Sequence, residues 1–439
     1  MTAAVSVSDP GSRPMLARLT PPLVFFLFLI PFAYSDDNDL LRAPKVVLVG
    51  VVALCFGFVM AGRYRVRPEM IFLMLYGALL TLQQLVIPNG DLVFGLQYAV
   101  VMVAAFLPAL TLAAVPWDLN RIERLWDLAI RVITVVIVVN SLLSRLFGLG
   151  ETFSGSGGRY FGYLGDSISP VIVFPTLYFI LSRRLLWAGA CLLALWLTGG
   201  KAALVMLGLG LLLIPLTRFR PFVVILGLIA FVVIGLWLYP TVASVLESDH
   251  LVYSWNTRLL SYEIGWRHFQ DSPVWGVGIN QSMIGLQAEA QNLAGIRGMT
   301  RYWDVGQVQN SFLRTLAETG TIGFVLLLSF CGLLIIRALK TIRTARRHPR
   351  SNVRSIAIAG ACWTVAFITS YQGVGWFEHV HPLFAWLLLF SAASTTAGDA
   401  LQRYSDRAAQ SRATMAREQA MRQPSSLAAA PDPIRGGRS

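Results

Sequence analysis

Residues 255–278 read WNTRLLSYEIGWRHFQDSPVWGVG, and a further polar, glycine-rich stretch follows before the segment closes with QNSFLRTLAETGTIG at residues 309–323. This is the longest polar segment in a chain that otherwise consists largely of apolar runs. Because the remainder has the character of a membrane protein, we expect the specific chemistry of the chain to lie in this segment.

The apolar runs predict the fold class. The chain has 439 residues, of which 55% are hydrophobic and 13% charged, as is typical of a polytopic membrane protein. Runs of roughly bilayer-spanning length lie at residues 19–34, 46–61, 70–87, 93–115, 128–147, 168–182, 185–198, 202–216, 222–239, 313–336, 356–371 and 382–396. The sequence therefore predicts an all-α polytopic membrane protein with about twelve transmembrane helices and one large periplasmic loop that contains short helices.

The positions of lysine and arginine predict the orientation. Basic residues follow every even-numbered run, which places those loops and both termini in the cytoplasm. We accordingly expect a cytoplasmic segment at residues 1–18, helices one to nine at 19–239, the periplasmic loop at 240–312, helices ten to twelve at 313–397 and a disordered cytoplasmic tail at 398–439. The first run also fits a secretory signal, an alternative that leaves the later orientation unchanged.

The net charge of +13 is explained mostly by this topology. No aromatic residues alternate with the cytoplasmic arginines in a soluble domain, so nucleic acid is not an expected partner. The four cysteines all lie within apolar runs and lack the spacing of a disulfide or metal site, which favours small core residues.

The polar segment is predicted to begin with an amphipathic helix at residues 256–270, ended by the Asp-Ser-Pro sequence before a Gly-x-Gly turn. Arg267 is placed to pair with Glu263 one turn earlier, whereas Arg258 lacks such a partner. A fixed guanidinium can hold phosphate oxygens with two donors, so Arg258 is the better candidate for an anionic ligand. The alternative is contact with lipid headgroups.

Two further cations are expected at the periplasmic side. Arg159 follows a glycine-rich stretch and precedes the sixth run, where backbone amides and a helix N-terminus favour a phosphate; a plain flexible turn is the alternative. Lys201 lies in a tight turn between two apolar runs, so its ammonium is expected at the outer mouth of the bundle, with snorkelling as the alternative. If Arg159, Lys201 and Arg258 converge, they form a diphosphate site.

Acids and bases are few in this region. Glu318 lies near the start of the tenth run, where Asn310 or Ser311 is placed to cap the helix, and stabilisation by the helix dipole is its simplest role. His379 and His381 with Glu378 precede the last run; they are weak evidence for a metal site and are more typical of proton carriers. No metal and no cofactor is predicted.

Four stretches of the chain resemble the O-antigen ligase and polysaccharide polymerase superfamily of bacterial inner-membrane glycosyltransferases. Residues 159–166 are similar to its Arg-x-x-Gly loop, and residues 198–203 to its Ser-Arg-Gly-Ala element, with Lys201 in place of arginine. Arg258 with residues 273–278 resembles the Arg…Pro-Leu-x-Gly-x-Gly element. Residues 309–323 resemble the His-Asn-x-x-Leu…Glu-x-Gly-x-x-Gly signature, with Gln309 at the place of the ligase histidine.

The resemblance implies a GT-C-like enzyme that uses an undecaprenyl-diphosphate-linked glycan as donor and an acceptor glycan or glycolipid, at the periplasmic face of the inner membrane. It implies that Arg258 and Lys201 hold the diphosphate, with Arg159 assisting. Glu318 or His381 is then the candidate base or acceptor-positioning group. The glycan-binding candidates are Gln309, Asn310, Trp266 and Trp303.

Gln309 cannot accept a proton from an attacking hydroxyl, which favours a polymerase over a ligase that transfers glycan to lipid A core. A chain-length regulator is then a possible partner. An oligosaccharyltransferase acting on protein uses the same donor and differs only in its acceptor. A transporter or flippase is the alternative of another class, but it would carry its charges nearer the middle of the membrane.

Overall fold

The structure is a computed structural model, and it describes residues 68–87, 119–147, 151–153, 159–162, 168–198, 200–216, 249–279, 281–302, 305–349, 351–370 and 382–422, with isolated residues between 223 and 233. The predicted runs at 19–34, 46–61 and 93–115 lie outside the described residues, as does most of the run at 222–239.

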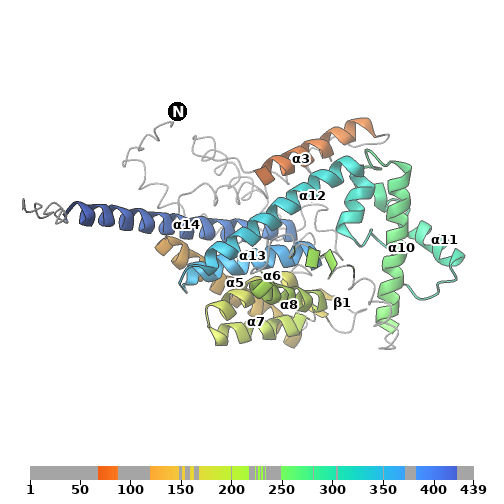
Figure 1. The fold of residues 1–439 in the computed structure, drawn as a ribbon. Coiled ribbons are helices and arrows are strands. Elements are labelled where there is room, and N and C mark those ends of the chain that lie inside the picture. The colour runs from red at the N-terminus through yellow and green to blue at the C-terminus, as the bar shows by residue number, and fades with distance from the viewer. Residues whose placement is uncertain are drawn as a thin grey trace, which may run out of the picture.

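Helices occupy the apolar runs that the structure describes (Figure 1). They are α3 (Pro68–Val86), α5 (Leu119–Phe147), α6 (Ile168–Leu181), α7 (Leu185–Thr198), α8 (Lys201–Leu216), α12 (Ser311–Arg346), α13 (Asn352–Ser370) and α14 (Pro382–Arg422). Among the residues that the structure describes, three helical stretches are long and apolar enough to cross a membrane, at residues 122–147, 311–346 and 352–370. Four shorter apolar helices lie in α3, α6, α7 and α8. The chain is a largely helical membrane protein, and the count of twelve spans stays a prediction.

Helix α13 is the centre of the bundle, packed against α6, α8, α12 and α14. Its sequence alternates small and large apolar residues, so neighbouring helices approach closely on all sides. Gly360 lies against α14, where an added Cβ would come within 2.7 Å of the Phe390 carbonyl oxygen. The Trp363 indole donates a hydrogen bond of 2.7 Å to the Pro170 carbonyl in α6. The buried indole of Trp363 thus links α13 to α6.

Several polar contacts gather at one end of the bundle. Asp127 in α5 accepts hydrogen bonds from Tyr178 at 2.6 Å and Arg131 at 2.8 Å, and it also pairs with Arg184 before α7. Arg346 at the end of α12 donates to the carbonyl of Ile214 in α8 at 2.6 Å. We call this end, formed by the starts of α5, α7 and α13 and the ends of α6, α8 and α12, the basic end. The basic residues of several predicted cytoplasmic loops therefore share one end of the bundle.

Two features differ from the expected all-helical chain. A small antiparallel sheet joins β1 (Glu151–Phe153) to β2 (Arg159–Gly162), so part of the predicted glycine-rich loop is a strand. The prediction of a disordered tail from residue 398 is wrong up to Arg422, because α14 continues to that residue. This stretch is rich in alanine, glutamine and arginine, which are good helix formers, and it extends a helix that packing has already nucleated.

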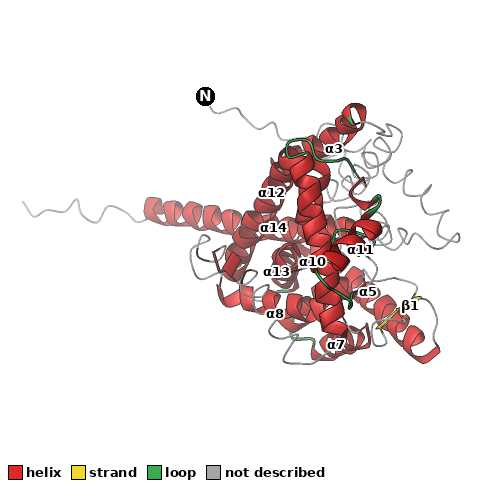
Figure 2. Ribbon diagram, turned by 90° about the vertical axis from the view of Figure 1, so that its right-hand side faces the viewer, coloured by secondary structure: helices red, strands yellow, loops and turns green. Residues whose placement is uncertain are grey.

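The polar segment forms a separate group of helices beside the start of α12 (Figure 2). It contains α10 (Asp249–Asp271), the single turn η4 (Gln281–Met283) and α11 (Leu286–Ile296). A small apolar cluster joins α10 to α11, with Leu260 and Ile264 on one side and Leu286 and Leu293 on the other. The location of this segment in the periplasm stays a prediction.

Candidate functional site

Helix α10 confirms the predicted helix and begins seven residues earlier than expected. It ends at Asp271 as predicted, and Gly276 and Gly278 follow with positive φ angles. The predicted pair of Arg267 with Glu263 is present at 2.8 Å. The expectation that Arg258 lacks a partner is wrong: its guanidinium donates to Ser254, one turn earlier in the part of α10 that the sequence analysis did not include.

The chain before α12 returns to the middle of α10, beside Arg258. The Ser261 hydroxyl donates to the Arg258 carbonyl at 2.9 Å and accepts a hydrogen bond of 3.2 Å from the Gln309 backbone amide. Gly265 permits this approach, since a Cβ there would come within 2.9 Å of Val308. Two residues assigned to the site by sequence, Arg258 and Gln309, are thus neighbours although about fifty positions separate them.

The turn after α10 is interlocked with the kink of α12. The amides of Val277 and Gly278 donate to the carbonyls of Ala317 and Glu318 at 2.9 Å each, as the amide of Thr321 does to the Pro273 carbonyl. Neither segment has regular helical geometry here, so backbone groups that lack a helical partner are satisfied by the other segment.

Glycines make the interlock possible. Gly320 has φ 63° and ψ −166° inside α12, a backbone conformation that glycine adopts without strain. A Cβ on Gly276 would overlap the Glu318 backbone, and one on Gly320 would overlap the Val274 carbonyl. The two motifs that carry the resemblance, residues 273–278 and 309–323, therefore form one structural unit.

A buried ion pair lies at this unit. Arg314 is 1% exposed and Glu318 5% exposed, and the Arg314 Nε donates to Glu318 Oε1 at 2.9 Å. The Ser282 hydroxyl in η4 donates to the same oxygen at 2.6 Å. Buried charges are costly unless they are paired and hydrogen-bonded, so each group depends on the others. Glu318 is therefore held in place by residues from two segments.

Helix α3 supplies a fourth element of this unit. The Gln83 amide nitrogen donates to the carbonyl oxygens of Glu318 and Trp275. One buried side chain thus joins the turn after α10 to the kink of α12. The position of Glu318 is determined by residues from four parts of the chain.

Of Arg159 and Lys201, the structure describes the backbone only. Arg159 begins β2, which leads toward α6, and Lys201 begins α8. Gly200 lies against the start of α6, where an added Cβ would be 2.6 Å from the Cβ of Ser169. The starts of α6 and α8 are therefore side by side, at the end of the bundle opposite the basic end. The side chains of both cations lie outside the described residues, so their convergence on Arg258 stays a prediction.

The remaining site candidates differ in how much the structure says of them. Asn310 is the N-cap of α12, as predicted, and its side-chain oxygen accepts from two amides at 3.0 Å. Trp266 is 48% exposed, with its ring 5.2 Å from that of Phe269. Trp303 and His381 lie outside the described residues. Within the part of the chain that is described, no three His, Cys, Asp or Glu side chains are grouped to hold a metal ion.

The sequence analysis assigned no role in the site to Arg314. The i, i+4 spacing from Arg314 to Glu318 on a helix was the available signal. Ser282 carried no comparable signal, because it reaches Glu318 only through the tertiary fold.

Comparison with known families gives a specific match. Residues 185–328 match the family model described as O-antigen ligase. This part of the chain is therefore similar to the O-antigen ligase family. The match confirms the predicted resemblance to the O-antigen ligase and polymerase superfamily, whose members are glycosyltransferase-like enzymes. No curated protein matches the chain.

The matched region extends from α7 to the first half of α12. It includes Lys201, Arg258 and the interlocked unit, whereas Arg159 and His381 lie outside it.

Proposed function

We propose that the protein is a polysaccharide polymerase that transfers an undecaprenyl-diphosphate-linked glycan to the hydroxyl of an acceptor glycan at the periplasmic face of the inner membrane. The product would be an exopolysaccharide, a capsule or an O-antigen. The match to the O-antigen ligase family model supports the class of reaction, and the glutamine at position 309 supports the polymerase branch.

In the proposed reaction the acceptor hydroxyl oxygen attacks the anomeric carbon of the donor. The bond from that carbon to the diphosphate oxygen breaks, and undecaprenyl diphosphate leaves with the bonding electrons. Negative charge develops on the leaving diphosphate, where preorganised cations are most effective. Arg258 and Lys201 take this role, with Arg159 assisting, and the cations act in place of a metal.

The hydroxyl proton needs an acceptor. Gln309 occupies the place where the resembled ligases have histidine, and its side-chain amide does not accept a proton at neutral pH. This is the observation that favours a polymerase. Glu318 and His381 remain the candidates for the base or the acceptor-positioning group, and Asn310, Trp266 and Trp303 for contacts with the sugars.

A transporter or flippase is less well supported. Arg131, a charge within the fifth apolar run, pairs with Asp127 at 2.8 Å near the basic end. The pair lies within α5, and Asp127 also binds Tyr178 of α6 and Arg184 before α7. This charged cluster fixes helices near one end of the bundle, so it does not mark a charged path through the middle of the membrane.

The test is the intermediate that accumulates when the gene is deleted and complemented with Arg258→Ala at wild-type membrane levels. A polymerase defect leaves single repeat units on the lipid carrier. Long lipid-linked polymer would instead identify a ligase, and unchanged surface polysaccharide would contradict the proposal.

A further inference from the structure

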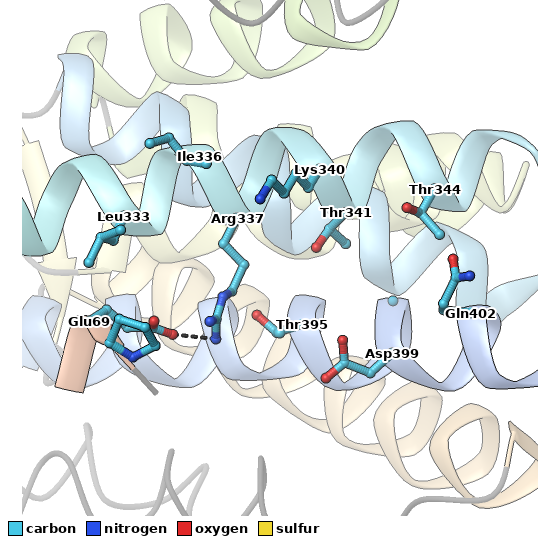
Figure 3. Close-up of a pocket in the computed structure, with 12 residues that line it drawn as sticks. Glu69, Leu333, Ile336, Arg337, Lys340, Thr341, Thr344, Thr395, Asp399 and Gln402 are labelled. Atoms are coloured by element: carbon cyan, nitrogen blue, oxygen red, sulfur yellow. Dashed lines mark ion pairs between the residues drawn. The ribbon is translucent and has the colours of Figure 1, made fainter. Parts of the chain in front are cut away.

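A cavity of about 450 Å³ opens between α3, α12 and α14 near the basic end (Figure 3). Its charged and polar lining comes from three helices, with Arg337 and Lys340 on α12, Thr395 and Asp399 on α14, and Glu69 at the start of α3. The domain match ends at residue 328, and none of these residues takes part in the proposed transfer reaction.

The lining changes from apolar to charged along α12. Leu333 and Ile336 line the cavity first, and Arg337, Lys340 and Thr344 follow toward the basic end. Lys340 comes twenty residues after the kink at Gly320, a helix length of about 30 Å, which is about the thickness of the hydrocarbon core of a bilayer. With the kink of α12 at one surface of the bilayer, this length predicts that the charged part of the cavity lies at the depth of the headgroups of the other leaflet, with its apolar part toward the acyl chains.

The charges in the cavity have both signs. Arg337 pairs with Glu69, and Figure 3 shows Lys340 on the same face of α12, with Asp399 across the cavity on α14. Lys340 and Asp399 are both exposed, and Lys340 has no ion-pair partner among the residues described. Two cations and two carboxylates balance, so the cavity does not have the excess positive charge typical of sites for anionic lipids.

Helices α12 and α14 touch at the floor of the cavity. Gly398 lies directly against Thr341, where an added Cβ would be 2.9 Å from the threonine methyl group. Helices α12 and α14 are therefore in close contact beneath the charged groups. Thr341, Thr344 and Thr395 also line the cavity, and the Thr395 hydroxyl donates to the Ser391 carbonyl in its own helix at 2.8 Å.

We propose that this cavity binds the headgroup of a zwitterionic phospholipid, with Lys340 and Arg337 at the phosphodiester and Asp399 at the ammonium group. Leu333 and Ile336 contact the start of an acyl chain. The site lies at the end of α12 opposite Arg258, so its occupancy is independent of the transferase reaction.

The experiment measures lipid binding to the purified full-length chain by native mass spectrometry, with dioleoyl phosphatidylethanolamine and dioleoyl phosphatidylglycerol as probes. The wild type is expected to bind the ethanolamine lipid at least fivefold more tightly. Lys340→Gln is expected to weaken its binding about fivefold, the effect of one cation at a membrane surface. Lys340→Arg, which keeps the charge, is expected to retain it.

Asp399→Asn tests the contact with the ammonium group separately from the contact with the phosphodiester. It is expected to weaken the ethanolamine lipid about fivefold, to leave the glycerol lipid unchanged, and so to abolish the preference. Arg407→Gln, an exposed change on α14 outside the cavity, is the matched control and should alter neither lipid.

Three results would overturn the proposal. In the first, Lys340→Gln and Asp399→Asn behave like the control. In the second, the wild type prefers phosphatidylglycerol, which would identify a site for anionic lipid. In the third, soluble glycerophosphoethanolamine displaces the lipid at equal concentration, which would identify a site for a free phosphodiester.

Discussion

Arg314 helps to fix the geometry of residues 309–323, the stretch that resembles the family's last signature. It is almost fully buried, and its partner Glu318 carries both the ion pair and the hydrogen bond from Ser282. Removing one partner of a buried pair leaves the other charge uncompensated, whereas removing both is much less costly.

Arg314→Met is therefore expected to lower the free energy of unfolding by about 3–5 kcal/mol. Thermal unfolding of the purified variant in detergent measures this. The double variant Arg314→Met with Glu318→Gln should recover part of the loss, because no buried charge is then left unpaired. A single variant as stable as the wild type would show that Glu318 is held by other means.

Asn310 has a structural role as well as a predicted one in glycan binding. Asn310→Ala removes the cap of α12 and is expected to cost about 1 kcal/mol of stability. Asn310→Asp retains the capping oxygen but removes the amide donor. If Asn310 also binds sugar, the aspartate variant will be stable yet show a raised KM for the acceptor; an unchanged KM would limit Asn310 to the cap.

At the residue scale, local pairs could be predicted and tertiary pairs could not. The Arg267 and Glu263 pair and the Asn310 cap follow from spacing along one helix, and both are confirmed. The Ser254 partner of Arg258 was missed because the predicted helix began two residues too late to include it. Ser282 reaches Glu318 only through the turn after α10, which sequence spacing does not specify.

At the scale of elements, the interlock of the turn after α10 with the kink of α12 is the main feature of the candidate site. It needs glycine for two separate reasons, a left-handed backbone and the absence of a Cβ at a close approach. Gly276 has both requirements, whereas Gly285 has φ 74° but open space around it.

This contrast yields a matched pair of variants. Gly285→Ala is expected to cost about 1–2 kcal/mol from backbone strain alone. Gly276→Ala is expected to cost about 1–3 kcal/mol more, because its Cβ would overlap the Glu318 backbone. Unfolding of both variants in detergent measures the difference, and equal losses would contradict the close packing of the two motifs.

Helix bounds followed well from apolar runs because burial in lipid or in the bundle requires an unbroken apolar stretch. Helix α7 begins and ends where its run predicts. The extension of α14 to Arg422 was missed. A polar helix that continues a packed helix and a disordered tail have similar compositions, so composition does not tell them apart. The strands β1 and β2 are too short to give a periodic signal.

At the scale of the whole molecule, the bundle has two chemically different ends. Arg184 and Arg346 lie at the basic end, and the starts of α6 and α12 lie at the other. Helix α12 also contacts the polar helix α10. The positive-inside rule predicts that the basic end faces the cytoplasm.

Cysteine labelling tests that orientation. Arg297→Cys in the polar segment and Arg347→Cys after α12 both replace exposed residues, and the three described native cysteines are buried. A membrane-impermeant maleimide is expected to label the first variant in intact spheroplasts and the second only after permeabilisation. The opposite pattern would invert the topology and place the candidate site in the cytoplasm.

The central claim is that Arg258 stabilises the departing diphosphate, and the most direct test is the rate at which the purified protein releases undecaprenyl diphosphate from a lipid-linked glycan in the presence of acceptor. Arg258→Ala is expected to be at least about 100-fold slower than the wild type. Arg267→Ala, on the same helix but 53% exposed at its side chain and paired with Glu263, should stay close to the wild-type rate. Equal rates for the two variants would contradict the proposed role of Arg258.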